Sequence, residues 1–250
     1  MDISKILEEF GFEMAVKSIT DNGSVARYRF TPPKGRLLRD LVNLEDDIAL
    51  RLGVENVCIG ADYKNSEMVI DIPLKERKFF EFNSAVDKLK ASKNELPIVI
   101  GKTLENEIFI NDLSNLQGLA VFGSAGSGKT VFLKSIINSI ITTKAVGEAC
   151  FIIAGEKVKE DFNAFKDSPY LQMPFISDVK DFKDALSWLK SEMDRRKNLF
   201  VETNTKHISQ YNQLQGVEKM PRLVFIIDEY SIYQEALGEE FDMWIKRTLA

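Results

Sequence analysis

The sequence is poor in cysteine and histidine, and this scarcity excludes several kinds of chemistry. Its 250 residues include two cysteines, Cys58 and Cys150, which lie far apart in the sequence. Two such cysteines cannot build a disulfide framework or a multi-cysteine zinc site, so we interpret them as reduced thiols of a cytoplasmic protein. The single histidine, His207, argues against a histidine-based metal centre or catalytic triad.

Long apolar runs are also missing. The longest, such as residues 223–227, are far shorter than the about 20 apolar residues that a membrane-spanning helix needs. The amino terminus has no basic start followed by an apolar stretch, so no signal peptide is visible. We therefore expect a cytoplasmic protein with no membrane segment in this chain.

The rest of the composition is that of a globular protein. Hydrophobic residues make up 44% of the chain and charged residues 28%, with 33 Lys and Arg against 38 Asp and Glu, a net charge of −5. The length suits one large domain or two modest ones, with a core that needs neither disulfide nor metal.

The first third of the chain predicts a small α+β domain. Residues 24–30 alternate between polar and apolar side chains, which is typical of a half-buried strand. Asn43 is placed to cap a helix that Gly53 ends, and two further strands are expected at residues 57–59 and 68–72.

The pattern changes near residue 90. A charged stretch at residues 75–93 is expected to form a linker helix, which gives a small domain at 1–90 and a larger one at 91–250. In the larger domain, strands are expected at residues 118–122, 149–154 and 223–227, and helices at 129–143 and after a cap at Asp178. This alternation of strand and helix predicts an α/β domain with a mostly parallel sheet covered by helices.

One motif in the larger domain points directly to phosphate chemistry. The run Gly123-Ser124-Ala125-Gly126-Ser127-Gly128-Lys129-Thr130 matches the phosphate-loop pattern Gly-x-x-x-x-Gly-Lys-Ser/Thr in full. Its glycines permit a tight loop whose backbone N–H groups point at phosphate oxygens, and the loop opens a helix whose N-terminus also favours anions. We expect Lys129 to reach the β- and γ-phosphates of ATP and the Thr130 hydroxyl to bind Mg²⁺. The alternative is a Gly-rich turn that happens to contain Lys and Thr.

A second acidic feature follows the apolar run at residues 223–227. Asp228 and Glu229 stand at the carboxyl end of this expected strand, where a phosphate loop needs a further contact to Mg²⁺. We expect Asp228 to hold the metal's water shell and Glu229 to act as general base on the attacking water. The alternative is two solvated carboxylates at a strand end. Together the two motifs predict an ATPase with Lys129 and Glu229 as catalytic residues.

These and other segments resemble the FtsK/SpoIIIE family of ATP-driven DNA translocases. In the larger domain the resemblance lies in Leu96-Pro97-Ile98-Val99-Ile100-Gly101-Lys102, in the phosphate loop with its flanks, in Glu192-Met193-Asp194-Arg195-Arg196, in Tyr211-Asn212 and in residues 224–230. In the smaller domain it lies in Arg27-Tyr28-Arg29-Phe30, in Pro33, in Gly35, in residues 42–50 and in Ile70-Asp71-Ile72-Pro73. The resemblance covers roughly residues 11–80 and 96–250.

The resemblance implies a RecA-like P-loop NTPase core preceded by a small α+β domain. It further implies a homo-oligomeric ring, a hexamer, that hydrolyses ATP to move double-stranded DNA. Neither section of this chain is basic, but a ring can concentrate basic loops in its channel. The family also has a strand between that of the phosphate loop and that of Asp228, in a part that would follow Ala250 with the sensor and arginine finger. We therefore expect a C-terminal truncation, the alternative being a naturally short protein.

One segment departs from the family pattern. After residues 151–153 the family usually has Asp-Pro-Lys, whereas this chain has Ala154, Gly155, Glu156 and Lys157, of which the lysine alone matches.

The sequence leaves two other functions open. A related P-loop ATPase could drive protein secretion or conjugative transfer, and stimulation of hydrolysis by DNA would discriminate it from a DNA motor. A nucleotide-dependent assembly module with little turnover is the third possibility, for which assembly without hydrolysis would be the sign.

Two groups of basic residues could also have a function. Arg195 and Arg196 could be offered to the ATP of a neighbouring subunit, although cations that complement a helix C-terminus are the favoured interpretation. Lys34, Arg36 and Arg39 could follow a DNA backbone, although a solvated face is favoured.

Overall fold

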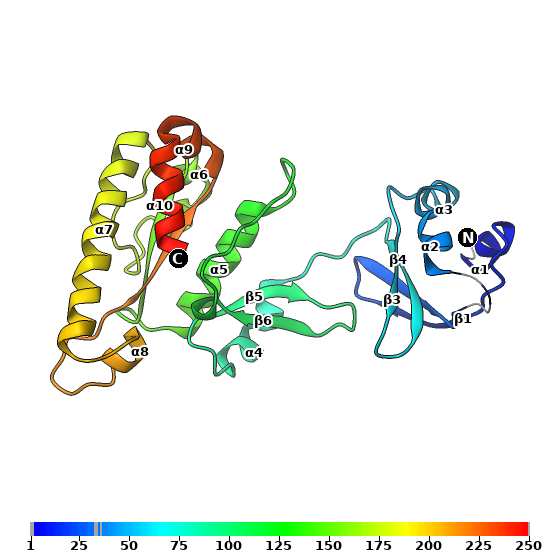
Figure 1. The fold of residues 1–250 in the computed structure, drawn as a ribbon, viewed down its shortest axis with the longest axis horizontal. Coiled ribbons are helices and arrows are strands. Elements are labelled where there is room, and N and C mark those ends of the chain that lie inside the picture. The colour runs from blue at the N-terminus through cyan, green and yellow to red at the C-terminus, as the bar shows by residue number, and fades with distance from the viewer. Residues whose placement is uncertain (1–2, 33–34, 36, 250) are drawn as a thin grey trace. The chain divides into compact units, whose positions relative to one another are not determined.

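The computed structural model describes residues 3–32, 35 and 37–249. The chain divides into two compact units (Figure 1). The first consists of Met1–Ala85 with Ile100–Phe109, and the second of Val86–Val99 with Ile110–Ala250. No helix among the described residues is long and apolar enough to cross a membrane.

The first unit is built on a four-stranded antiparallel sheet. Its strands are β1 (Val16–Asp21), β2 (Val25–Phe30), β4 (Glu67–Pro73) and β3 (Cys58–Asp62), which lie side by side in that order. The short helices are α1 (Ile3–Glu9), α2 (Leu38–Val42) and α3 (Glu45–Leu52). The predicted strands of this domain are therefore confirmed to within a few residues.

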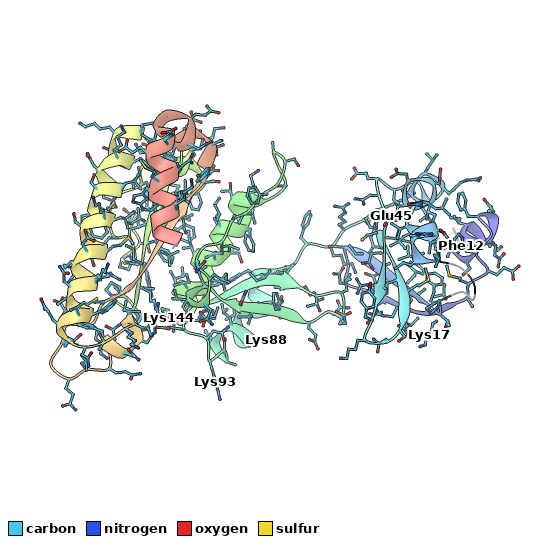
Figure 2. All side chains as sticks on the ribbon, in the orientation of Figure 1. Phe12, Lys17, Glu45, Lys88, Lys93 and Lys144 are labelled. Carbon is cyan, nitrogen blue, oxygen red and sulfur yellow. The ribbon has the colours of Figure 1, made fainter. Side chains whose placement is uncertain are left out.

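Alternation along the strands separates a core face from a charged face. Phe30 and Ile70 are fully buried and pack with Leu41 and Ile48 of the helices, and Phe12, labelled in Figure 2, belongs to the same core. On the opposite face, residues of neighbouring strands form ion pairs across the ladder. Arg27 of β2 lies directly opposite Asp71 of β4 and donates two hydrogen bonds of 2.7 Å to its carboxylate.

The predicted cap at Asn43 is wrong. The backbone N–H of Asn43 donates to the carbonyls of Arg39 and Leu41, so Asn43 ends α2 instead of beginning a helix. Helix α3 starts after Leu44, and its predicted end at Gly53 is confirmed by a left-handed φ of 65° there. The expected helix is therefore present as α3, and α2 is an additional short helix that ends at Asn43.

The predicted linker helix at residues 75–93 is confirmed only in part. A 3-10 turn, η1 (Phe82–Ala85), leads into α4 (Val86–Lys90), while residues 75–81 are irregular. The N–H groups of Leu74 and Lys78 donate to the carbonyls of Ser24 and Gly23. Since these donors are engaged with the turn between β1 and β2, a helix does not start there.

The second unit has helices around a pair of parallel strands. Its elements after α4 are the strands β5 (Pro97–Lys102), β6 (Ile108–Asp112), β7 (Ala149–Ala154) and β8 (Arg222–Ile227), the helices α5 (Lys129–Thr143), α6 (Val158–Asp161), α7 (Val179–Glu202), α8 (Ile208–Tyr211), α9 (Tyr230–Leu237) and α10 (Glu239–Leu249), and the 3-10 turns η2 (Leu113–Asn115) and η3 (Asn163–Phe165). Strands β5 and β6 pair with each other. The end of β5, from Ile100, and the start of β6, up to Phe109, belong to the first unit.

Strand β7 is buried along its whole length and pairs in parallel with β8. Helices α7, α9 and α10 cover one side of this pair through an apolar cluster that includes Ile152, Phe182, Tyr233 and Phe241 (Figure 1). The predicted cap of the long helix is confirmed, because the Asp178 carboxylate accepts the N–H of Asp181 at 2.9 Å.

The predicted strand at residues 118–122 is wrong. These residues are irregular, and their side chains include Leu119, 41% exposed, and Phe122, 91% exposed. A strand needs a neighbour for its backbone groups, and among the described residues no strand or isolated bridge pairs with residues 118–122. The expected mostly parallel sheet is thus present as short mixed sheets in which the segment before the phosphate loop has no partner strand.

The two arginines of α7 are held by one carboxylate. Arg195 and Arg196 donate to Glu192 at 2.6 and 2.7 Å through their Nε atoms, and Arg196 also donates to the carbonyl of Pro221 at 2.9 Å. Helix α7 has no basic residue in its last turn, so the interpretation as helix C-terminal cations is wrong. Glu192 instead orients Arg196, and the hydrogen bond from Arg196 to Pro221 connects α7 to the residue before β8.

These contacts predict a pH-dependent contribution to stability. The hydrogen bond from Arg195, with those from Arg196, lowers the pKa of Glu192 from 4.5 to about 2. Because the pKa is lower in the folded chain, the stabilisation is complete above pH 4.5 and is lost as the pH falls toward 2. Urea unfolding across this window should show a smaller decline for Glu192→Gln than for wild type. Equal declines in both proteins would contradict the assignment.

Candidate active site

The phosphate-loop motif forms an exposed loop that leads into α5. The first five residues of the motif are exposed and the last three are half-buried. The exposed ones are Gly123, Ser124, Ala125, Gly126 and Ser127, and the half-buried ones are Gly128, Lys129 and Thr130. Gly126 and Gly128 have left-handed φ angles of 75° and 97°, which residues with a Cβ adopt only at a cost. These two glycines therefore allow the loop to turn into the first residue of α5.

A third glycine, Gly123, stands where the loop has no space for a side chain. A Cβ on Gly123 would lie 2.4 Å from the Oγ of Ser127, far inside contact distance. The backbone N–H of Ser127 also donates to the carbonyl of Ser124 at 3.2 Å. Side chain and backbone thus fold the loop tightly around the position of Gly123.

The lysine of the motif folds over this loop. Its Nζ atom donates to the carbonyls of Gly123 and Ser124, each at 3.0 Å. The ammonium group is therefore held against the loop backbone, at the place where the motif predicts a bound phosphate.

The structure brings the two predicted motifs together. The Oγ1 atom of Thr130, in the first turn of α5, donates to the Oδ2 atom of Asp228 at 2.9 Å, although 98 positions separate them in the sequence. Asp228 is 9% exposed, and its N–H donates to the carbonyl of Ala154 at 2.8 Å, which extends the β7–β8 ladder. Backbone pairing thus holds the carboxylate against the helix.

Glu229 lies next to this pair with a different environment. It is exposed and occupies the N-cap position of α9 with φ 63° and ψ 57°. This left-handed turn separates the directions of β8 and α9. Glu229 is therefore an exposed residue that directly follows the buried Asp228 in the sequence.

The donors fit the ion that the motifs predict. Among the described residues no group of three or more His, Cys, Asp and Glu side chains could hold a metal ion. Mg²⁺ does not need such a cage, because it keeps several waters and takes one or two protein oxygens together with phosphate oxygens. The Thr130 hydroxyl and the Asp228 carboxylate offer two such oxygens side by side.

Sequence reasoning missed Gly155, which lies against Asp228, and Tyr233 of α9, the helix that Glu229 caps. A Cβ on Gly155 would lie 3.1 Å from the carbonyl oxygen of Asp228, and the Tyr233 hydroxyl donates to the carbonyl of Ile176 at 3.3 Å. The departure of residues 154–157 from the family pattern was a signal for Gly155, whereas no local motif marks Tyr233. In the basic cluster, Arg39 is exposed with its Nε atom 3.8 Å from the Oδ1 atom of Asp40, as expected for a solvated face, while Lys34 and Arg36 lie outside the described residues.

The geometry of the loop predicts a selective effect of one glycine. Gly128→Ala should weaken nucleotide binding strongly, because the left-handed turn that aims the loop at α5 becomes strained. The matched control is Gly147→Ala, since Gly147 has a similar φ of 89° and, like Gly128, nothing within 4 Å of an added Cβ.

Both variants should lose a similar amount of stability, about 1–2 kcal/mol, in thermal unfolding. Binding of a fluorescent ATP analogue should fall in Gly128→Ala alone. Equal affinities in the two variants would show that the loop geometry is not what binds the nucleotide.

A glycine-turned loop, the helix that it opens and an acidic strand end define the class of P-loop nucleotide-binding α/β proteins. Family models confirm and narrow this class. The model for the FtsK/SpoIIIE family matches residues 84–245, and that for the FtsK alpha domain matches residues 1–74. The chain belongs to the FtsK/SpoIIIE family.

Curated relatives match almost the entire chain. The DNA translocase FtsK of Clostridium tetani is 32% identical over 98% of this chain and 34% of its own length. That of Borreliella burgdorferi is 34% identical over 100% of this chain and 32% of its own length. The chain thus spans about a third of the length of these relatives.

Solved structures share the fold. The conjugation coupling protein TcpA of pCW3, in a monomer form with ATPγS, has a TM-score of 0.56 at 18% identity and covers 98% of this chain and 69% of its own. EssC (ATPases 2 and 3) from Geobacillus thermodenitrificans has a TM-score of 0.50 at 22% identity, covering 59% of this chain and 29% of its own. At these identities the likeness concerns the fold.

Proposed function

We propose that this chain hydrolyses ATP as part of a cytoplasmic motor that moves double-stranded DNA. The observation that carries the proposal is the 2.9 Å contact between Thr130 and Asp228, which joins the phosphate loop to the acidic strand end. Binding of phosphate alone would need only the loop. An acid held at the first turn of α5 adds what a Mg²⁺-dependent phosphoryl transfer requires.

Each residue of the site has a proposed role. The backbone N–H groups from Gly123 to Gly128 bind the phosphates, together with the N-terminus of α5. Lys129 leaves the loop carbonyls, which are neutral acceptors, for the β- and γ-phosphate oxygens, which are charged and stronger acceptors. Thr130 and Asp228 hold Mg²⁺, which neutralises charge that develops on the phosphates.

Glu229 is the proposed general base. Its exposed carboxylate follows Asp228 directly and can accept a proton from a water molecule that attacks the γ-phosphate. Asp228 is buried and already accepts the Thr130 hydroxyl, so it suits a metal ligand better than a base. We therefore assign metal binding to Asp228 and proton abstraction to Glu229.

The cargo and the assembly are inferred from the family. The curated relatives are named as DNA translocases, which supports DNA as the partner. That the DNA is double-stranded and that the working form is a homo-oligomeric ring, a hexamer, is proposed from the family resemblance alone. The net charge of −5 means that DNA contacts would have to be concentrated in local segments. The free thiols of Cys58 and Cys150 agree with a cytoplasmic location.

A second function has some support from the fold. TcpA is named as a conjugation coupling protein, and its structure covers nearly all of this chain. A related ATPase for conjugative transfer or protein secretion would use the same nucleotide site with another cargo. A nucleotide-dependent assembly module with little turnover would bind ATP and oligomerise without sustained hydrolysis.

Substitution of the loop lysine tests the site. Lys129→Ala should reduce steady-state ATP hydrolysis by roughly 100-fold or more, because it removes a charge aimed at the reacting phosphates. The matched control is Lys134→Ala on the same helix, whose Nζ lies 5.7 Å from the centre of the Phe162 ring, away from the loop. Unaltered turnover in Lys129→Ala would refute the assignment.

DNA dependence tests the cargo. Hydrolysis by the wild-type chain should rise several-fold with linear double-stranded DNA at low salt, since phosphate contacts weaken steeply as salt increases. Hydrolysis that DNA leaves unchanged would favour the transfer or secretion ATPase. ATP-dependent oligomerisation without hydrolysis would favour the assembly module.

A further inference from the structure

The turn at Asp228 and Glu229 needs support from its surroundings. Glu229 has a left-handed backbone, φ 63°, although it is not a glycine. Such a conformation persists only where the surrounding structure determines it. The contacts around the turn should therefore include groups that fix both carboxylates.

The first support is Gly155, which lies against Asp228. The N–H of Asp228 donates to the carbonyl of Ala154, which brings Asp228 against the next residue, Gly155. A Cβ on Gly155 would lie 3.1 Å from the carbonyl oxygen and 3.2 Å from the Cβ of Asp228. Gly155 is absent from the residues with positive φ, so it is needed for its lack of volume and not for its backbone conformation.

The second support comes from α9. Tyr233 lies one turn after Glu229, is 1% exposed, and stacks on Phe182 with ring centroids 3.7 Å apart. Its hydroxyl donates to the carbonyl of Ile176 at 3.3 Å. The first turn of the helix is thus attached to the segment that precedes α7.

One carbonyl joins the two supports. The oxygen of Ile176 accepts the Tyr233 hydroxyl and also accepts the backbone N–H of Gly155 at 3.0 Å. A connected path therefore runs from α9 through Ile176 to the residue that lies against Asp228. Both ends of the acidic turn are anchored at the same point.

We infer that Gly155 and Tyr233 are positioning residues that hold the Asp228–Glu229 turn in its working geometry. This inference rests on the proposed ATPase function, and neither residue touches the nucleotide in it. Gly155 sets the distance of Asp228 from Thr130, and so the affinity for Mg²⁺. Tyr233 fixes the start of α9, and so the direction of the Glu229 carboxylate toward water. The two substitutions should therefore have different kinetic signatures.

Tyr233→Phe tests the second of these roles. It keeps the stacked ring and removes the hydroxyl, so kcat should fall roughly tenfold, as for a base that is slightly misplaced, while KM for ATP stays unchanged. The matched control is Tyr170→Phe, because the Tyr170 hydroxyl also donates to a backbone carbonyl, that of Lys144 (labelled in Figure 2), at 2.6 Å. The control should keep the wild-type kcat.

A readout without nucleotide accompanies the kinetics. The N–H of Ile232 donates to the carbonyl of Glu229 at 3.2 Å within the turn that Tyr233 anchors. Hydrogen exchange at Ile232 should be faster in Tyr233→Phe than in wild type, and unchanged in Tyr170→Phe. This measurement reports the anchoring itself, independently of hydrolysis.

Gly155→Ala tests the first role. The added methyl group should push Asp228 away and raise the Mg²⁺ concentration needed for half-maximal hydrolysis severalfold, with binding of ATP in EDTA unchanged. The control is Gly60→Ala, since Gly60 lacks a left-handed φ and its added Cβ would make an ordinary 3.8 Å contact with Val69. The control should keep the wild-type Mg²⁺ dependence.

The outcomes separate this inference from the proposed function. A wild-type chain that does not hydrolyse ATP overturns the proposed function, and the catalytic part of the inference with it. With an active wild type, unchanged kcat and unchanged exchange at Ile232 in Tyr233→Phe overturn the role of Tyr233. With an active wild type, an unchanged Mg²⁺ dependence in Gly155→Ala overturns the role of Gly155.

Discussion

The hydrogen bond between Thr130 and Asp228 is the contact on which the site depends. It joins the first turn of α5 to the residue that follows β8. Because a hydroxyl and a carboxylate at this distance can share one hydrated cation, the contact turns a phosphate-binding loop into a site for Mg²⁺ and ATP. The surrounding elements hold the Thr130 hydroxyl and the Asp228 carboxylate in place.

Packing holds the strand side of the contact. Strand β7 is buried throughout, and β8 follows its register up to Ile227, so the backbone of Asp228 continues a parallel ladder. The Phe182 ring packs on Tyr233 and Phe241 from α9 and α10. Buried aromatic side chains contribute about 1.5–3 kcal/mol each through burial, and ring pairs add about 0.5–1.5 kcal/mol. This aromatic cluster keeps the helix after Glu229 in place.

Much of the site could be predicted from the sequence because its chemistry is local. The loop from Gly123 to Thr130 and the acids Asp228 and Glu229 are contiguous motifs, and pairing of a strand end with a phosphate loop is a general property of the class. The α7 cap at Asp178 and the helix end at Gly53 were equally local, and the structure confirms both.

The rest depended on contacts between distant residues. Residues 118–122 have the composition of a strand, but a strand forms only beside a partner, which is missing among the described residues. Asn43 could have capped either neighbouring helix, and its N–H bonds to Arg39 and Leu41 decided between them. Gly155 matters through its distance from Asp228, which no spacing in the sequence reveals.

A double-mutant cycle tests the central claim most directly. Thr130→Val, Asp228→Asn and the double variant should be compared with wild type in the gain of ATP-analogue affinity that Mg²⁺ produces. If the two groups hold one ion, either substitution removes most of that gain and the second removes little more, so the effects are strongly non-additive. Additive effects, or a Mg²⁺-dependent gain that survives in the double variant, would contradict the account.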